Sequence, residues 1–189
     1  MSKGIAAVIA DAYRRTHGHV LELVNDLPDE LLVRRAGPSS PSVAFHLWHL
    51  ARWADFLQEV LHGPGSQLWD KEKVAASWGL RHPSGAGLGY AETGMGMDDE
   101  AAANLSLPPK SVLFNYVRRA FGAAEEAVAA VDDQKLNSVY TGPRAADYFS
   151  GEKSLAYVIL RSLRHENRHL GMIECLLGAQ RPGPTNARS

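Results

Sequence analysis

Two histidines, His165 and His169, lie four residues apart in an apolar stretch near the C-terminal end of the sequence. Four residues advance a helix by about 400°, so the two imidazoles lie on one face, one turn apart. Both rings could therefore reach one metal ion. The alternative is a hydrogen-bonded histidine pair, but each buried polar group left without a partner costs about 1–3 kcal/mol. The spacing and the apolar context favour metal ligands.

A third histidine, His49, lies far away in sequence, in a second apolar stretch between Val43 and Leu50. Three neutral imidazoles with an open coordination position are typical of catalytic zinc and related divalent sites. His46 precedes His49 by three residues and shares a helix face with it only loosely. We expect one of these two histidines to be a ligand and the other a neighbour.

Glu166 follows His165 directly, so residues 165–169 also match the two-histidine and glutamate pattern of zinc proteases. Such a protease needs a third ligand further along the chain and a sheet that aligns the substrate. Only 20 residues follow His169 in this 189-residue sequence, and none of them is a histidine. We therefore interpret Glu166 as a solvated or salt-bridged side chain, with a role as a base near the metal as the alternative.

The other candidate residues have simpler interpretations. His17, His19, His62 and His82 lie near predicted helix ends or in loops, and we expect them to be solvated. Cys175 is predicted to be a small core residue. The apolar residues that continue the His165 and His169 stripe are expected to face the core as well: Met172, Ile173 and Leu176.

Apolar residues at helical spacing predict four long helices. The patterns run from Ile5 to Leu27, from Ser39 to Leu61, from Pro108 to Val131 and from Ser154 to Leu177. Pro41 suits the first turn of the second helix, and Gly178 is predicted to end the fourth. Residues 1–178 are thus expected to form one all-α domain, and residues 179–189 have the composition of a frayed tail.

The connection from residue 63 to residue 107 is long and glycine-rich, and it contains Trp69 and Trp78. Long loops in compact domains are commonly functional, so we expect it to form a lid or wall over one end of the bundle. Trp69 and Trp78 are the candidate residues for binding a substrate or thiol there. The alternative is that both tryptophans only dock the loop on the helices.

Composition excludes several classes of protein. The sequence is 45% hydrophobic, and 20 basic against 21 acidic residues give a formal net charge of −1. No basic cluster favours nucleic acid as a partner, and no apolar stretch approaches the roughly 18 residues of a membrane span. The apolar run at the N-terminus is too short for a signal peptide, and a single cysteine fits a reducing cytoplasm.

The motifs at residues 41–52 and 165–174, together with the loop segments 68–79 and 92–96, resemble the DinB-like superfamily over nearly the whole chain. This superfamily includes mycothiol-dependent maleylpyruvate isomerases and bacillithiol transferases. The resemblance implies an up-down four-helix bundle with a long loop insertion between helices 2 and 3. It also implies that His49, which directly precedes Leu-Ala-Arg, joins His165 and His169 on one divalent metal.

Similar proteins are thought to use the metal to bind and activate a thiol or water. The resemblance therefore implies a cytoplasmic metal-dependent enzyme, either a thiol S-transferase or a hydrolase, acting on a small molecule. Zinc is the first expectation, with nickel or iron as alternatives, and a low-molecular-weight thiol is a candidate cofactor. A homodimer is one assembly that the sequence allows. The rival hypothesis is a non-catalytic, metal-stabilised bundle that serves as a binding or stress-response module.

Overall fold

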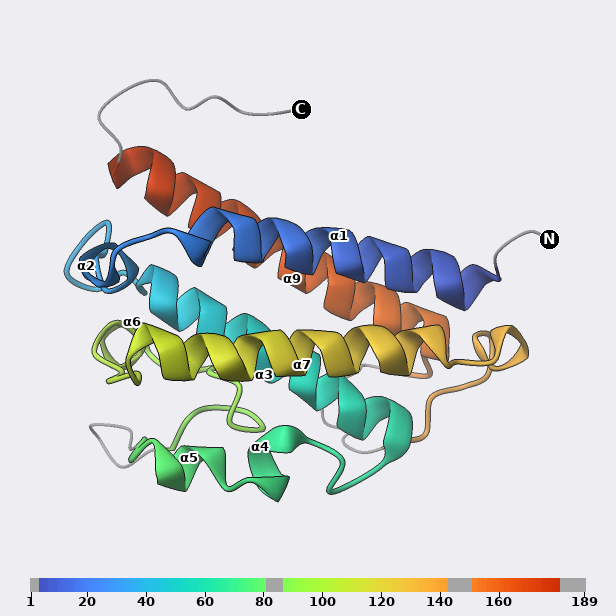
Figure 1. Cartoon of the computed structure of the whole chain (residues 1–189). Coiled ribbons are helices and arrows are strands. Elements are labelled where there is room, and N and C mark those ends of the chain that lie inside the picture. Colours follow the sequence, from blue (N-terminus) through green and yellow to red (C-terminus); the bar gives the residue numbers. More distant parts are fainter. Residues whose placement is uncertain (1–3, 81–86, 143–150, 181–189) are drawn as a thin grey trace.

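The computed structural model describes residues 4–80, 87–142 and 151–180. Within these ranges, four long helices lie side by side: α1 (Ile5–Asn25), α3 (Val43–His62), α7 (Lys110–Ala129) and α9 (Leu155–Gln180) (Figure 1). The prediction of an all-α bundle with a long insertion between its second and third long helices is confirmed. None of the described helices has both the length and the apolar character needed to cross a membrane.

The four helices follow an up, down, down, up order. α3 and α9 run in opposite directions, since His46 contacts His169 while His49 contacts His165. α1 and α9 run in the same direction, and the Tyr13 hydroxyl donates to the Ile159 carbonyl at 2.8 Å. The long 63–107 connection returns the chain along the bundle, so α7 runs parallel to α3 (Figure 1).

The connections contain short helices that the periodicity of the sequence hardly reveals. They are α2 (Asp29–Leu32), α4 (Leu68–Lys71), α5 (Val74–Ser77), α6 (Asp99–Ala103) and the 3₁₀ helix η1 (Asp133–Lys135). The sequence predicts one short helix near Asp70–Ser77, and this stretch contains the end of α4 and all of α5. Trp69 is on α4 and Trp78 directly follows α5, so both tryptophans belong to this compact helical part of the insertion.

The predicted positions of Pro41 and Gly178 relative to the helix ends are wrong. Ser42 is the N-cap of α3, and its side chain accepts a hydrogen bond from the Phe45 N–H at 3.1 Å, so Pro41 lies outside the helix. Gly178 lies inside α9, which continues to Gln180. A glycine in a helix costs only about 1 kcal/mol relative to alanine and does not by itself end the helix.

α3 is deeply buried, and the apolar run Val43–Leu50 predicts such a position at the centre of the bundle. Every residue from Val43 to Glu59 is buried. Polar side chains in this stretch, among them His49, Arg52 and Asp55, therefore need partners inside the protein. Their partners come from α9, α7 and the insertion, and these contacts build the site described below.

The buried stripe of α9 runs through Glu166, Ile173 and Leu177, which are 0%, 0% and 3% exposed. His165 is one residue, or about 100°, away from Glu166, so it lies at the edge of this stripe. Met172, seven residues after His165, lies on nearly the same face of the helix as His165 and is 43% exposed. Cys175 is exposed too. The predicted core positions of Met172 and Cys175 are therefore wrong.

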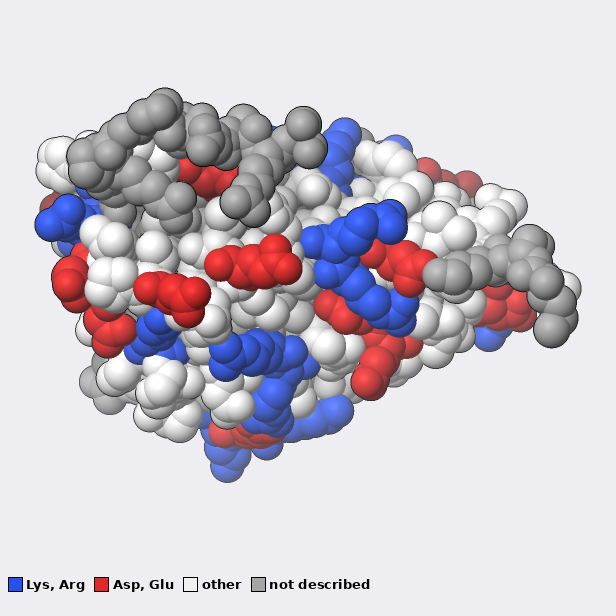
Figure 2. Space-filling view, turned by 45° about the horizontal axis from the view of Figure 1, so that its top comes forward, with Lys and Arg blue, Asp and Glu red and all other residues white. Residues whose placement is uncertain are grey.

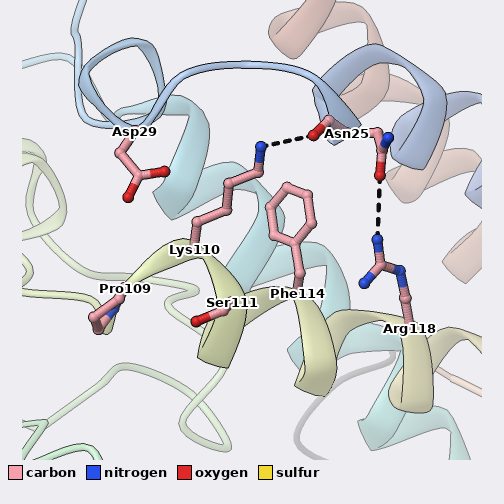
Figure 3. A pocket seen from close by; sticks show the side chains of 7 residues that line it. All are labelled: Asn25, Asp29, Pro109, Lys110, Ser111, Phe114 and Arg118. Atoms are coloured by element: carbon pink, nitrogen blue, oxygen red, sulfur yellow. Dashed lines mark hydrogen bonds between the residues drawn. The ribbon is translucent and has the colours of Figure 1, made fainter.

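Lys110 and Arg118 connect the start of α7 to the end of α1 around a pocket of about 350 Å³ (Figure 3). The Lys110 ammonium donates to the carbonyls of Asn25 and Leu27 at 2.6 and 2.7 Å, and Arg118 donates to the Asn25 side chain at 3.2 Å. Cations at a helix C-terminus satisfy its unpaired carbonyls. On the face shown in Figure 2, basic and acidic side chains intermingle.

Candidate metal centre

Three histidines from α3 and α9 converge at one point inside the bundle. The Nε2 atom of His165 lies 3.3 Å from Nε2 of His49 and 3.2 Å from Nε2 of His169. One ligand atom from each ring lies within 4.8 Å of the others, and no fourth His, Cys, Asp or Glu of the described residues joins them. The structure thus brings together the three residues that the sequence proposes as ligands.

The chemistry and spacing of these nitrogens fit a divalent cation. Two imidazole nitrogens bound to one tetrahedral zinc, each about 2.0–2.1 Å from it, lie about 3.4 Å apart. The two Nε2 distances to His165 are close to this value. Without a cation, a proton on Nε2 of His165 would be shared with Nε2 of His49 and His169, whereas a cation would bind the lone pairs of all three nitrogens. The three-histidine group could therefore hold one divalent metal.

The tautomer of His49 is determined by its surroundings. Its Nδ1 atom lies 2.5 Å from the carbonyl oxygen of Thr93, in the insertion. A carbonyl oxygen can only accept, so Nδ1 carries the proton and Nε2 of the neutral ring has a free lone pair. That lone pair points to His165. A hydrogen bond from the outer ring nitrogen to a carbonyl is the usual way in which proteins orient a metal-binding histidine.

The four clustered histidines are neutral near pH 7. Burial lowers the pKa of His46 to about 4 and, with a smaller effect of the His165 charge, lowers the pKa of His49 to about 3. Burial and the nearby charges of Arg168 and Arg161 lower the pKa of His165 to about 4. The pKa of His169 is lowered to about 2, again mainly by burial. Neutral imidazole is the form that binds metals.

His46 lies beside the group and contacts its outer edge. Its Nδ1 atom is 2.9 Å from Nδ1 of His169, on the side of that ring away from His165. With Nε2 of His169 as a ligand, its Nδ1–H donates to His46. His46 is 6% exposed, so it is a buried hydrogen-bond partner of His169, which agrees with the expectation of a neighbour.

His165 is oriented by packing. Its ring centroid lies 5.0 Å from that of Trp53 and 5.0 Å from that of His49. Its Nδ1 atom is buried and has no hydrogen-bond partner among the described residues. His165 and His169 are each half-buried, whereas His49 is 5% exposed. The two ligands from α9 are thus more exposed than the ligand from α3.

Glu166 lies outside the three-histidine group. One of its carboxylate oxygens contacts Nε2 of His17 at 2.9 Å, and Glu125 contacts Nδ1 of the same ring at 2.7 Å. The salt-bridged interpretation of Glu166 is therefore confirmed. The expectation that His17 is solvated is wrong, since this ring is 2% exposed and stacks on Phe121 with centroids 3.8 Å apart. Its acidic partners lie on α7 and α9, more than 100 residues away in sequence.

The remaining histidines divide into two cases. His19 and His62 are exposed, as expected, and His82 lies outside the described residues. The sequence also predicts that the connection from Asp132 to Lys153, with Tyr140, Tyr148 and Phe149, lines the same end of the bundle as residues 63–107. Tyr140 is half-buried, and Tyr148 and Phe149 lie outside the described residues.

Trp69 and Trp78 pack against α7. Their ring centroids are 5.8 Å apart and lie 5.7 and 5.4 Å from that of Tyr116. Trp69 is 2% exposed, and its Nε1–H donates to the Glu92 carboxylate. This packing favours the alternative in which both tryptophans dock the insertion on the bundle. Their part in binding a substrate or thiol stays a prediction.

The comparisons with known proteins agree with this architecture. A family model described as the DinB superfamily matches residues 12–173 of the chain. The chain therefore belongs to the DinB superfamily. Its three-histidine group fits a metal-binding member of that superfamily.

A solved structure, a conserved protein from Enterococcus faecalis, is similar with a TM-score of 0.76 and 15% sequence identity. The match covers 94% of this chain and 97% of that one, and at this identity it concerns the fold alone. No curated protein matches the sequence.

Proposed function

We propose that this protein is a metal-dependent enzyme, either a thiol S-transferase or a hydrolase, whose divalent metal is held by His49, His165 and His169. The observation that carries the proposal is the convergence of three neutral Nε2 atoms without a fourth protein ligand among the described residues. Catalytic zinc sites commonly have three protein ligands, and structural sites have four.

In this proposal, the protein side chains bind the metal and orient its ligands. The Thr93 carbonyl fixes the His49 tautomer, and Nδ1 of His46 accepts a hydrogen bond from Nδ1–H of His169. When bound, a divalent cation supplies Lewis-acid chemistry, which lowers the pKa of a thiol or water molecule. The proposal requires that a small molecule reaches the metal past His165 and His169, which are half-buried, whereas His49 is buried.

Zinc is the first candidate, and nickel or iron are alternatives, because imidazole nitrogens suit all three. The proposal includes a small-molecule or thiol partner and a reducing cytoplasmic environment, in which the exposed thiol of Cys175 stays reduced. A homodimer remains a further expectation.

Metal analysis of protein purified without a histidine tag is the first test. We expect about one divalent metal per chain, and its identity by mass spectrometry decides between the candidates. The metal-loaded protein is then assayed with a panel of low-molecular-weight thiols and electrophiles, and with ester and amide substrates. Turnover by the metal-loaded wild type that is lost in His49→Ala supports an enzyme.

The rival function is a non-catalytic, metal-stabilised bundle. The observation in its favour is that the ligands link two helices of the core, so a metal would stabilise the fold by itself. A protein with one bound metal, no turnover in the panel and no thiol binding by calorimetry would support this rival.

A further inference from the structure

Arg52 is a fully buried cation in the centre of α3, three residues after His49, and it is 1% exposed. Its guanidinium also lies over the Trp69 ring, 4.3 Å from the centroid. The guanidinium donates five hydrogen bonds, to Asp55 (3.1 Å), Tyr116 (3.0 Å), Gln67 (2.8 Å) and the backbone carbonyls of Glu92 (2.9 Å) and Ala91 (3.1 Å). All of its donors are used, as burial of a permanent cation requires.

The two carbonyls belong to a strained turn. Ala91 and Glu92 have φ values of 50° and 53°, in the left-handed region that side chains with a Cβ atom disfavour. Two such residues in succession need stabilisation from their surroundings. Arg52 provides it directly, because Nε donates to Glu92 and Nη2 donates to Ala91. The turn is thus tied to α3 by one side chain.

The next carbonyl along the chain is the one that His49 uses. Thr93 accepts the hydrogen bond from Nδ1 of His49, and the Gly94 N–H closes the turn on the Leu88 carbonyl at 2.7 Å. Because Glu92 and Thr93 are covalent neighbours, a shift of the turn moves the Thr93 carbonyl. Arg52 and His49 are one helical turn apart on α3 and bind neighbouring carbonyls of the same turn.

We propose that Arg52 is a positioning residue for His49: it holds the left-handed turn at residues 91 and 92 so that the Thr93 carbonyl keeps His49 in the Nδ1–H tautomer, with Nε2 directed to His165 and His169. The effect on the tautomer stands without any metal. Its consequence for metal affinity rests on the proposed function.

The alternative role of Arg52 is purely structural, since the same guanidinium contacts Asp55, whose carboxylate accepts from the Leu68 and Trp69 N–H groups of α4. Arg52→Lys tests the difference, because a lysine keeps the charge near Asp55 but cannot reproduce the paired donors to Ala91 and Glu92. The matched control is Tyr116→Phe, which removes one hydrogen bond of Arg52 on the side away from the turn.

The first measurement is the tautomer of His49 in metal-free protein labelled with ¹⁵N-histidine. Long-range ¹H–¹⁵N spectra distinguish the two tautomers, and the His49 signals are identified by their loss in His49→Gln. We expect the Nδ1–H form in the wild type and in Tyr116→Phe, and averaged signals of two tautomers in Arg52→Lys. If the variants only lost stability, the His49 tautomer signals would be the same in Arg52→Lys and Tyr116→Phe.

The second measurement is zinc affinity by competition with a chelator. We expect a 10–100-fold loss in Arg52→Lys, which is the usual range for removing support behind a metal ligand, and less than a twofold change in Tyr116→Phe. A folded Arg52→Lys protein with wild-type His49 signals and wild-type zinc affinity would overturn the proposal.

If Arg52→Lys does not fold, the wild type still provides a test. The Arg52 Nε–H should exchange slowly with solvent, and its signal should shift when zinc is added, because it shares the turn with the His49 acceptor. A rapidly exchanging Nε–H, or one unaffected by zinc while the His49 signals change, would contradict the proposal. Failure of the wild type to bind zinc would instead refute the proposed metal site and leave the tautomer result to decide the role of Arg52.

Discussion

At the scale of single residues, the candidate metal centre is a set of neutral imidazoles whose outer nitrogens have different partners. His49 donates to a backbone carbonyl and His169 contacts a fourth histidine, while His165 is held by packing against Trp53. These partners, together with burial, decide which nitrogen of each ring is available. The predictions at this scale concern the ligands and the residue beside them.

Replacing any one of the three proposed ligands by alanine should abolish stoichiometric metal binding, because two imidazoles alone hold a divalent ion weakly. Tag-free His49→Ala, His165→Ala and His169→Ala proteins are analysed for bound metal by mass spectrometry. His62→Ala is the matched control, since this histidine is exposed at the end of the same helix as His49. Full metal content in His169→Ala would refute the site.

His46→Ala should reduce metal affinity by about 10–100-fold without emptying the site, because it removes the hydrogen-bond partner of His169 and no ligand. Chelator competition in tag-free protein measures this change. An empty site in His46→Ala together with a filled site in His49→Ala would reverse the assignment of the two histidines.

At the scale of elements, the structure depends on polar contacts between helices that are distant in sequence. His17 on α1 lies between Glu125 on α7 and Glu166 on α9, and the neighbouring Arg14 lies 3.9 Å from Glu125. Burial by itself would lower the pKa of His17, but the charge of Glu166 and the hydrogen bonds to both glutamates raise it from 6.5 to about 9. His17 is therefore a cation that holds three helices together at neutral pH.

This raised pKa predicts a pH-dependent stability. The contribution of His17 is complete below pH 6.5, the ordinary value, and is lost as the pH rises to about 9, because the folded state then loses its proton. At about 1.4 kcal/mol per pH unit, up to about 3 kcal/mol is lost over this range. Urea unfolding at pH 6 and pH 9.5, with a chelator present, measures the change.

His17→Gln should flatten that pH dependence, because glutamine can donate to a carboxylate but does not titrate. His19→Gln is the control, since His19 is exposed and contacts Glu174 at 3.0 Å on the surface. The buried hydroxyl of Tyr13, whose pKa is raised by burial and by Glu166, stays neutral throughout this range. An equal pH dependence in wild type and His17→Gln would contradict the prediction.

The turn that carries Thr93 gives a second prediction at this scale. Gly94 has φ +87°, and an added Cβ would lie 2.7 Å from Cζ3 of Trp48 and 3.1 Å from Nδ1 of His49. Gly94→Ala should therefore lower both thermal stability and metal affinity. Gly96→Ala is the matched control, because Gly96 has φ +81° but open space around its Cβ position.

Both variants carry the cost of a left-handed alanine, about 1–2 kcal/mol. Only Gly94→Ala adds the steric overlap, so thermal unfolding and chelator competition should show a larger loss for Gly94→Ala. Equal losses of stability and metal affinity in the two variants would show that the close approach to Trp48 and His49 has no effect.

At the scale of the whole molecule, the proposed ligands connect α3 to α9 across more than 100 residues of sequence. A metal bound there binds only the folded chain, so it should stabilise the bundle by RT ln(1 + [metal]/Kd). At a free zinc concentration about 100 times Kd, the increase is about 2.7 kcal/mol. Calorimetry should show a higher Tm with zinc in the wild type and no zinc effect in His49→Ala, while a zinc-independent Tm in the wild type would contradict the prediction.

The sequence by itself determined the four long helices, because their apolar spacing depends only on neighbouring residues along each helix. It also indicated the central position of α3, since Val43–Leu50 is apolar around much of the helix and an apolar helix must be covered on all sides. Within the site, the four-residue spacing of His165 and His169 was sufficient to propose a metal, and the DinB-like motif distinguished His49 from His46.

Only the tertiary structure decided the environment of the remaining polar residues. His17 lies at helical spacing between Tyr13 and Val20, which indicates a buried face, but its partners Glu125 and Glu166 come from other helices. Arg52 could be suspected from a charge within an apolar helix, but its link to the turn at residues 91 and 92 depends on how the insertion folds back. Met172 and Cys175 follow the apolar pattern yet are exposed, because packing against α1 and α3 fixes the rotation of α9 about its axis. The partners of His17 and Arg52 and the exposure of Met172 and Cys175 depend on contacts between helices, which the spacing of residues within one helix does not reveal.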